Sequence, residues 1–480
     1  MLNFRKRGRH GQLFIGVVAG ALGASYALAG LPAGATVTNS TGNHVLIGSG
    51  SVTTYDMMQS MDILFNDSPG CTITVTYNAP PSPENFACQN SAKTLTRGNT
   101  ENPTNDISVQ ESGLGSSTGI AQLENQGSGA STLKTAAVSY ARSSRALKTT
   151  DPPGLNFVAY ATDGVSWFHF TKTRGVPTPS SCISNLTQTQ LTQIFGPTDA
   201  AEKYWTFYIP KGKKEGLGCG EVKNGKGVLV PAFVRVYSAQ PGSGTLSTFD
   251  SYIGEKSEAY VASQGTRYNA THIIVENEDH SILVNGDEAN AVFFFSFGKY
   301  ALECIGKNIL GCQPRTDTVQ LGAINGIHAT KKDILCFYNS TCTAKLPPFP
   351  LPRLLYNVYS NGSNRSFPAA TPSTLNYVSE VGFICKPNTV AGRPITDINT
   401  GVSYRSEIAS VIDEWGFFPV PFQKDEVTGP VPHPAASRLV RSVYGINDPA
   451  YHNAGTAPRQ NQGTAGRAPA GYCIVSSTDG

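Results

Sequence analysis

The chain has 480 residues; 39% are hydrophobic and 15% charged, while 49 glycines and 31 prolines make up about a sixth of it. The low charge and the high glycine and proline content exclude a long coiled coil, and the absence of a strict glycine period excludes collagen. The 22 phenylalanines, 20 tyrosines and 3 tryptophans can build a large core, which excludes a disordered chain. This length predicts two domains, or two lobes of one fold.

Residues 1–29 have the features of a secretory signal peptide. Four basic residues within positions 5–9 precede an apolar run over 13–29. Small residues at Ala27 and Ala29 suit cleavage before Gly30, and a second site lies before Thr36. The run of about seventeen residues is shorter than the roughly twenty that span a bilayer. We therefore expect an exported protein, in the periplasm, outside the cell or at its surface; an uncleaved anchor is the alternative.

The charge of the expected mature chain is close to neutral. Removal of residues 1–29 leaves 33 basic and 34 acidic residues, a formal net charge of −1. A nucleic-acid partner needs a basic face and is therefore not expected. One basic cluster, Lys203, Lys211, Lys213 and Lys214, lies next to Glu215 and predicts a solvated loop.

Ten cysteines in an exported chain, with no Cys-x-x-Cys spacing of a zinc or redox site, indicate disulfides. Their spacing favours Cys71–Cys88, Cys182–Cys219, Cys304–Cys312, Cys336–Cys342 and Cys385–Cys473, although other pairings stay open. No cysteine lies near the expected cleavage site, so the chain is not expected to be a lipoprotein.

Short apolar runs alternate with amphipathic stretches, which is typical of an α/β fold in which helices cover a mixed or parallel sheet. In chain order, the pattern predicts strands at 44–48, 73–77, 155–161, 233–237 and 292–297. Apolar residues at helical spacing predict helices at 54–66, where three methionines and Phe65 share a stripe, after 245, and at 408–415, ended by Gly416. The Pro-, Gly- and Ala-rich tail predicts extended or wrapping structure, tied down by Cys473.

Four short segments combine glycines with small hydroxyl residues, and each is expected between a strand and a helix. They are 48–54, 113–119, 141–145 and 241–245. The first amides of a helix lack internal partners and carry the positive end of its dipole, and glycine lets an oxyanion approach the backbone closely. Any one segment is ordinary capping or turn chemistry. Four of them in order along an exported α/β chain predict an anion site.

Six stretches resemble the phosphate-binding receptors of phosphate ABC transporters, within the type II periplasmic solute-binding proteins. They are GSGSVTTYD at 48–56, GLGSSTG at 113–119, YARSSRAL at 140–147, SNLTQTQLTQIFG at 184–196, PGSGTLSTF at 241–249 and LYNVYSNG at 355–362. They follow the family's order and cover roughly 45–420. The PGSGT and GSS stretches are the most specific of the six.

The resemblance implies two α/β lobes, joined by crossover strands, that close on one tetrahedral oxyanion held by helix N-termini of both lobes. Lobe 1 would comprise 40–160 and 350–422, lobe 2 would comprise 161–349, and 423–480 would form the tail. The candidate ligand-binding residues are Ser51, Thr53, Thr54, Ser116, Ser117, Arg142, Ser143, Ser144, Gly242, Ser243, Gly244 and Thr245.

The sequence departs from the family at two charged positions. The family's carboxylate, which accepts a hydrogen bond from a protonated oxyanion, falls on Ser144, and its arginine falls on Ala239. Serine can donate or accept, so discrimination between phosphate and sulfate is expected to weaken. Arg142 or Arg145, or less favourably Arg235, is expected to replace the lost charge.

Other motifs in the sequence do not change this expectation. Residues 115–119 fit the G-x-S-x-G pattern of hydrolases, which would make Ser117 a nucleophile, but no spacing selects a partner among the histidines at 169, 272, 280 and 328. The eight histidines show no metal spacing, and no phosphate-binding G-x-x-x-x-G-K-[ST] loop occurs. The acidic patch Glu276, Glu278 and Asp279 is expected to be a solvated face.

Together these features predict an exported, monomeric, two-lobed solute-binding protein without cofactor or metal. It would capture a small inorganic oxyanion, phosphate first, without chemical transformation and in partnership with an ABC permease. The alternative is a secreted or surface protein that reuses the scaffold for scavenging, sensing or adhesion.

Overall fold

The computed structural model describes residues 48–67, 115–124, 138–196, 201–263, 272–277, 279–304, 318–338, 342–345, 347–364, 369–370, 372–380, 382–385, 389–390, 393–394, 404–420 and 473–478. The expected signal peptide, the strand at 73–77, most of the tail, and Cys71, Cys88 and Cys312 lie outside these residues. In the part of the chain that is described, every helix is too short or too polar to cross a membrane.

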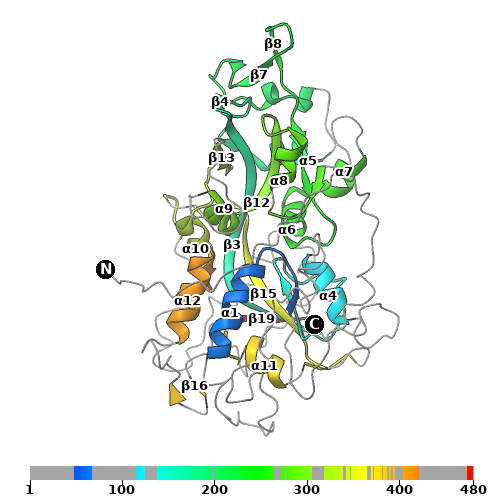
Figure 1. Ribbon diagram of the computed structural model, residues 1–480, viewed down its shortest axis with the longest axis vertical. Helices are drawn as coiled ribbons and strands as arrows, with labels where there is room; N and C mark the ends of the chain where they lie inside the picture. Colours follow the sequence, from blue (N-terminus) through cyan, green and yellow to red (C-terminus); the bar gives the residue numbers. More distant parts are fainter. Residues whose placement is uncertain are drawn as a thin grey trace, which may run out of the picture.

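One strand, β3 (Leu155–Thr173), runs through the whole molecule (Figure 1). Its first sixteen residues are buried without interruption, as expected for a strand covered on both faces. Its first half pairs with β15 (Pro352–Ser360), β18 (Phe418–Pro419) and β19 (Ile474–Ser477). Its second half pairs with β12 (Ala291–Ser296), β13 (Thr318–Leu321) and β4 (Val176–Pro177). The strand therefore belongs to both lobes of a mixed α/β fold, as predicted.

The sheet has the order β1-β2-β15-β3-β12-β9, with β1 (Gly48–Gly50), β2 (Tyr140–Ser143) and β9 (Arg235–Val236). The pairs β1–β2 and β12–β9 are parallel, whereas β3 pairs antiparallel with both β15 and β12. We call the part built on the first half of β3 lobe 1 and the part built on its second half lobe 2. The residue limits that we expect for the lobes stay a prediction.

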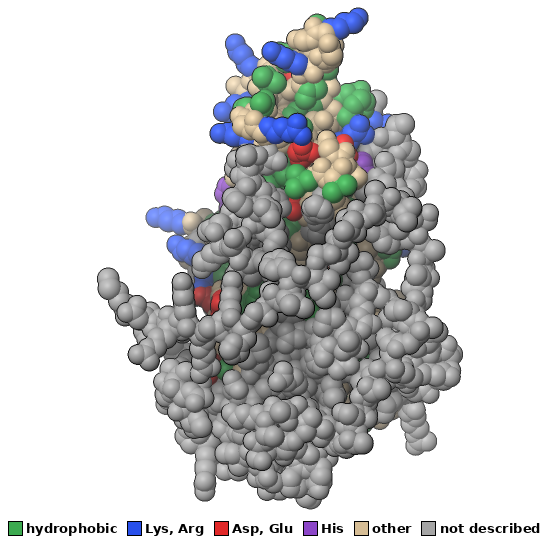
Figure 2. Space-filling model, viewed as in Figure 1, with side chains coloured by type: hydrophobic (Ala, Val, Ile, Leu, Met, Phe, Trp, Pro, Cys, Tyr) green, Lys and Arg blue, Asp and Glu red, His purple; other side chains and the backbone are tan. Residues whose placement is uncertain are grey.

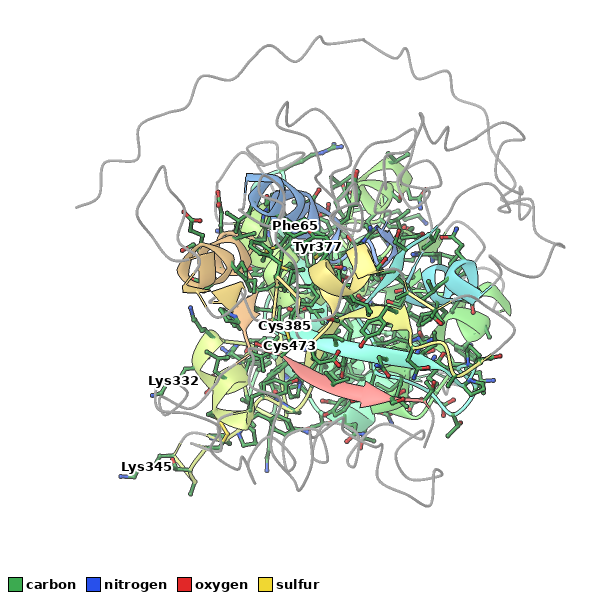
Figure 3. The ribbon with its side chains drawn as sticks, turned by 90° about the horizontal axis from the view of Figure 1, so that it is seen from below. Phe65, Lys332, Lys345, Tyr377, Cys385 and Cys473 are labelled. Carbon is green, nitrogen blue, oxygen red and sulfur yellow. A yellow bond between two sulfur atoms is a disulfide. The ribbon has the colours of Figure 1, made fainter. Side chains whose placement is uncertain are left out.

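Lobe 1 is covered by α1 (Tyr55–Asp67), α4 (Ser116–Glu124), α11 (Pro372–Val378) and α12 (Tyr404–Glu414). The predicted stripe of α1 is buried: Met57, Met58, Met61 and Phe65 are at most 1% exposed. The ring of Phe65 stacks on that of Tyr377, with 4.6 Å between the ring centroids. Figure 3 labels the two residues side by side. Burial of this one face fixes α1 against the sheet.

Lobe 2 carries the remaining helices and several two- to four-residue strands. The helices are α5 (Gln188–Phe195), α6 (Gly244–Ile253), α7 (Ser257–Ser263), α8 (His280–Asn285), α9 (Phe297–Cys304), α10 (Lys331–Tyr338), η3 (Ala201–Lys203) and η4 (Trp205–Tyr208). The strands are β5 (Asn185–Leu186), β6 (Gly216–Leu217), β7 (Gly220–Lys223), β8 (Leu229–Pro231), β10 (Ser238–Ala239), β11 (Ile273–Ile274) and β14 (Ala323–Ile324); β16 (Thr389–Val390) and β17 (Arg393–Pro394) form a separate pair. Phe249 of α6 stacks on Phe294 of β12 at 4.6 Å. This contact seats α6 on the sheet.

Three predicted disulfides are confirmed: Cys182–Cys219, Cys336–Cys342 and Cys385–Cys473. The last lies beside β19, which pairs with β3 (Figure 3). The C-terminal strand is thus an integral part of the sheet, held both by hydrogen bonds and by a covalent bond.

Two of the four glycine- and hydroxyl-rich segments differ from their predicted setting. The first begins inside a strand, because β1 covers 48–50. The third is wrong as a helix start: 140–143 form β2, and turns lead from there to β3. Only the segments before α1, α4 and α6 therefore offer helix amides.

Candidate functional site

The candidate site lies where the two lobes meet, beside β3. Lobe 1 contributes the turn before α1, the start of α4 and the end of β2. Lobe 2 contributes the turn before α6 and the turn that follows β11. Four of these five pieces are the segments singled out from the sequence. The turn after β11 was not among the four predicted segments, and only the tertiary structure places it at the site.

From lobe 1, the turn before α1 surrounds one oxygen of the Glu276 carboxylate. The amides of Val52 and Thr53 lie 3.1 and 3.3 Å from Oε1. The hydroxyls of Ser51 and Thr53 lie 3.2 and 3.3 Å from the same atom. Glu276 is only 1% exposed. A negative charge from lobe 2 is therefore buried among four donors of lobe 1.

From lobe 2, the N-terminus of α6 holds the other oxygen. Ser243 is the N-cap: its hydroxyl accepts from the amide of Leu246 at 3.0 Å and donates to Glu276 Oε2. The amide of Thr245 donates to Oε2 at 3.2 Å. Free amides and the helix dipole favour an anion at this place. We call the six donors, from Ser51, Val52, Thr53, Ser243 and Thr245, the anion cradle; Glu276 is its occupant.

Serine hydroxyls and a glycine pack directly against the cradle. Ser51 Oγ lies 2.8 Å from Ser144 Oγ, which lies 3.3 Å from Ser116 Oγ. The Ser144 amide donates to Ser116 Oγ at 2.9 Å. A Cβ atom at Gly244 would stand 2.2 Å from Ser116 Oγ and 2.3 Å from Ser144 Oγ. Glycine is therefore required here, because it alone lets the start of α6 approach lobe 1 so closely.

The lobes are closed upon each other around the cradle. The amide of Ser117 in α4 donates to the carbonyl oxygen of Gly242 at 3.0 Å. Gly242 has a φ of +87°, which orients that carbonyl at no steric cost. Lys299 of α9 forms an ion pair with Asp56 of α1. The closed arrangement thus has polar contacts of its own beside the cradle.

Asn277 connects threonines of both lobes. Its Nδ2 donates to Thr53 Oγ1 at 2.8 Å and lies 3.4 Å from Thr245 Oγ1. Its Oδ1 accepts from the amide of Ser296 at 2.8 Å. Its φ of +58° lies in the left-handed region, which asparagine tolerates better than most residues. This turn directs the preceding Glu276 into the cradle.

The cation that reaches the cradle is Arg353 of β15. Its Nε and Nη2 donate to Asp163 Oδ2 of β3 at 2.9 and 2.7 Å. Its Nη1 donates to Thr245 Oγ1 at 2.9 Å and to the carbonyl oxygen of Ser144 at 3.2 Å. Arg353 is 3% exposed and Asp163 fully buried. Because the carboxylate of Asp163 neutralises the guanidinium of Arg353, this arginine supplies the cradle with oriented hydrogen-bond donors more than with net positive charge.

The three arginines expected from the sequence have other partners. Arg142 donates to the backbone carbonyl oxygens of Gly48, at the start of β1, and Ser51, just after its end. Arg145 forms a buried ion pair with Asp151, and Arg235 lies 3.8 Å from Asp287 at the surface. Arg142 thus shapes the loop that carries the cradle amides, whereas Arg353 contacts a cradle residue directly. Arg353 interrupts the apolar run 349–356, and a charged residue within such a run was the signal that could have identified its buried role.

The other predicted site residues lie around the cradle. Ser143 donates to the carbonyl oxygen of Arg145 at 2.8 Å, which stabilises a local turn. Ser117 Oγ accepts from Arg145 Nε at 3.0 Å. The hydroxyl of Thr54 is buried without a hydrogen-bond partner. Gly242 contributes its carbonyl oxygen to the contact between the lobes.

The prediction that the acidic patch is a solvated face is wrong for the two of its residues that the structure describes. Glu276 and Asp279 are 1% and 5% exposed, and Glu278 lies outside the described residues. Glu276 follows the strand 273–274, and ligand sites of α/β sheets form beyond the carboxyl ends of strands. That position was the signal for a buried role.

The metal and nucleophile alternatives can be compared with the side chains that the structure describes. Within the described ranges, no group of three His, Cys, Asp or Glu is placed to hold a metal. His169, one possible partner for Ser117, lies in β3 with its Nδ1 2.9 Å from Ser180 Oγ. Burial lowers the pKa of His169 to about 3. This histidine is a neutral core residue at physiological pH.

No protein-family model and no curated protein matches this sequence. Solved structures resemble it at low similarity. A candidate phosphate ABC transporter substrate-binding protein with bound phosphate, from Clostridium perfringens, is 15% identical with a TM-score of 0.38, over 79% of this chain and 100% of that chain. An ABC-type phosphate transport receptor from Vibrio cholerae is 15% identical with a TM-score of 0.38, over 78% and 99%.

A third structure, described as a possible phosphate binding protein from Planctomyces limnophilus, is 12% identical with a TM-score of 0.37, over 79% of this chain and 94% of that chain. Likeness at this level carries no conclusion about what the present chain binds.

Proposed function

We propose that this chain is an exported two-lobed solute-binding protein that captures a small inorganic oxyanion, phosphate first, in the anion cradle, and delivers it to an ABC permease. The observation that carries the proposal is the set of six donors, from both lobes, on the single carboxylate of Glu276. The two carboxylate oxygens stand for two oxygens of the captured anion.

Capture by amides and hydroxyls suits reversible binding without chemical transformation. Closure removes water, so each donor interacts more strongly with the anion than it would in solvent. Micromolar affinity corresponds to about 8 kcal/mol. Hydrogen bonds to a charged group contribute roughly 1.5 to 3 kcal/mol each, so six such bonds can supply this free energy after ordering costs in a cradle that Glu276 does not occupy.

An incoming anion must displace Glu276, because two negative charges cannot share the cradle. The exchange conserves the number of hydrogen bonds, so the free energy comes from the higher charge of the oxyanion and from solvation of the released carboxylate. The tethered carboxylate is present at high effective concentration. It therefore raises the apparent Kd in inverse proportion to the fraction of molecules whose cradle is empty.

A second candidate function is favoured by the same residue. Glu276 satisfies the donors that a ligand would need, and the lobes are closed around it. A secreted or surface protein that has kept the scaffold and lost uptake would have this property. In that case the carboxylate is a permanent structural replacement for a ligand.

Isothermal titration with phosphate and with sulfate separates the two candidates. The samples are the oxidised chain from Gly30 onward, its Glu276→Ala and Glu276→Gln variants, and Glu414→Ala as a control at an exposed position of α12. For capture we expect micromolar phosphate binding by Glu276→Ala, at least about tenfold tighter than for the parent chain. Because serine replaces the expected carboxylate at 144, sulfate should bind comparably.

The outcomes are distinct. Addition of Ser243→Asp to Glu276→Ala should abolish binding by placing a fixed negative charge at the cradle. No heat and no thermal stabilisation by either anion in any variant would rule out capture and leave the scaffold function. Equal affinities of the parent chain and Glu276→Ala would retain capture and refute displacement of Glu276.

A further inference from the structure

The upper end of lobe 2 in Figure 1 exposes an unusual set of apolar side chains. Among the described residues, seven large hydrophobic side chains are exposed, and six of them lie here. They are Val176, Phe207, Leu217, Val228, Leu229 and Phe233. We call the surface formed by the last residues of β3, by β4, η4, β6, β7 and β8, and by their turns the lobe 2 tip. Single exposed apolar residues are ordinary, whereas a cluster indicates an interaction surface.

Positive charge surrounds these side chains. Figure 2 shows Lys and Arg side chains projecting from this end with hydrophobic side chains between them. The exposed cations are Lys172, Arg174, Lys211, Lys213, Lys214, Lys223 and Lys226, and the acidic residues are Glu215 and Glu221. The tip therefore has a formal charge of +5, although the whole chain carries only +3. The lysines at 211, 213 and 214, which predicted a solvated loop, are exposed, and they belong to a surface that also carries exposed apolar side chains.

Local structure holds the tip in a defined shape. The disulfide Cys182–Cys219 and the hydrogen bond from the Gly220 amide to the Pro179 carbonyl oxygen attach β7 to the body of lobe 2. The side chain of Asn224 accepts from two amides of the turn between β7 and β8 at 2.9 and 3.0 Å. The apolar side chains are thus presented by ordered turns and by a cross-linked sheet.

We propose that the lobe 2 tip docks on an anionic lipid surface. Apolar side chains that enter the headgroup region, with lysines placed against anionic headgroups, are the two components of peripheral membrane binding. A soluble polyanion would pair with the lysines but leave Phe207 and Leu229 in water. A folded protein partner would need a complementary pocket for side chains that come from several separate turns. A bilayer accommodates both components without a fixed shape.

Docking by the tip leaves the cradle accessible. Asp163, the partner of Arg353 beside the cradle, lies ten residues before the upper end of β3 at Thr173. At about 3.3 Å per residue this distance is about 30 Å. A bound protein would hold the cradle at about that height above the lipid, clear of the surface.

Vesicle flotation tests the proposal with the oxidised chain from Gly30 onward, so that the apolar run 13–29 does not contribute. The vesicles contain phosphatidylcholine alone or a mixture with phosphatidylglycerol. We expect binding to the mixed vesicles, weakened by high salt, and little binding to phosphatidylcholine. Lys213→Glu with Lys214→Glu, and separately Phe207→Ser with Leu229→Ser, should each reduce partitioning by about tenfold or more.

Matched controls use exposed side chains elsewhere. Lys332→Glu with Lys345→Glu changes two exposed lysines, labelled in Figure 3, on α10 and shortly after it; Figure 1 shows α10 well below β7 and β8. Val284→Ser changes the exposed apolar residue outside the tip. Neither should change partitioning. Absence of binding to the mixed vesicles, or binding that the tip variants do not reduce, would overturn the proposal. Self-association abolished by Phe207→Ser, without vesicle binding, would identify a second copy as the occupant and also overturn it.

Discussion

The anion cradle and the lobe 2 tip differ in how deeply their charged side chains are buried. In the cradle, a buried carboxylate is matched by six donors, and the nearby Arg353 is matched by Asp163. At the tip, cations and large apolar side chains are both exposed. Buried polar groups need partners within the chain, because water cannot reach them. Exposed groups are solvated and remain accessible to an external partner, so the tip is distinguished by exposure and the cradle by burial with internal partners.

The largest effect should come from separating Arg353 and Asp163. Arg353→Ala leaves a buried carboxylate without its cation and should lower the free energy of unfolding by about 3–5 kcal/mol. Lys331→Ala is the matched control, because its pair with Asp413 is about half exposed, at 53% and 54%, and should contribute below about 1 kcal/mol. Urea denaturation measures both. Equal costs for the two variants would show that burial does not distinguish these pairs.

Removal of the cradle's occupant should have the next largest effect. Glu276→Ala leaves buried donors of both lobes without an acceptor and should lower the free energy of unfolding by about 2–3 kcal/mol in anion-free buffer. Thermal unfolding measures the change, and under the proposed function phosphate should restore much of it. Glu276→Gln, which retains an acceptor oxygen, should lose less. A Glu276→Ala variant as stable as the parent chain would contradict the importance of the satisfied donors.

Asp250 lies on α6, the helix whose N-terminus contributes to the cradle, and its carboxylate has fewer hydrogen-bond donors than that of Glu276. Ser257 gives it two hydrogen bonds, but burial outweighs them and raises its pKa to about 7. A raised folded-state pKa adds stability that is complete below about pH 4 and is lost as pH rises through about 7. Asp250→Asn should therefore become more stable relative to the parent chain from pH 5 to pH 8, by about 2–3 kcal/mol. Urea unfolding at both pH values measures this difference; a difference independent of pH would contradict it.

The smallest effect on stability is expected at the tip. Phe207→Ser and Leu229→Ser remove side chains that are 45% and 42% exposed, so each should change the free energy of unfolding by less than about 0.5 kcal/mol. Their consequence should be confined to vesicle binding. A loss above about 2 kcal/mol in urea denaturation would mean that these side chains support the fold and not a partner.

Several elements were predictable because their signals are local. The stripe of α1, the strands within β3 and β12 and the start of α6 follow from spacing over a few residues. Hydroxyls and amides of three predicted segments do meet at one place. The third segment was misassigned to a helix start, because a run of small polar residues fits a strand followed by a turn equally well.

The charged residues of the site were harder to predict because their partners are remote in sequence. Glu276 meets Ser51 across 225 positions, and Arg353 meets Ser144 across 209. In the sequence, Glu276 lies near Glu278 and Asp279, and such a group is typical of a solvated surface. Only the position of β11 shows that Glu276 lies at the junction of the lobes. Likewise, Arg142 and Arg145 lie near the site in sequence, yet hydrogen bonds commit them to neighbouring backbone and to Asp151.

The sequence by itself determined the α/β class and the turns whose amides and hydroxyls can hold an anion, because each depends on short-range periodicity or turn chemistry. It favoured the three disulfides that the described residues contain but left other pairings open. Only the tertiary structure decided that Glu276 occupies those donors, that Arg353 supplies the nearby guanidinium, and that the basic loop shares its surface with exposed apolar side chains. The reason is physical: burial and electrostatic pairing are properties of groups brought together by packing, and no local pattern specifies them.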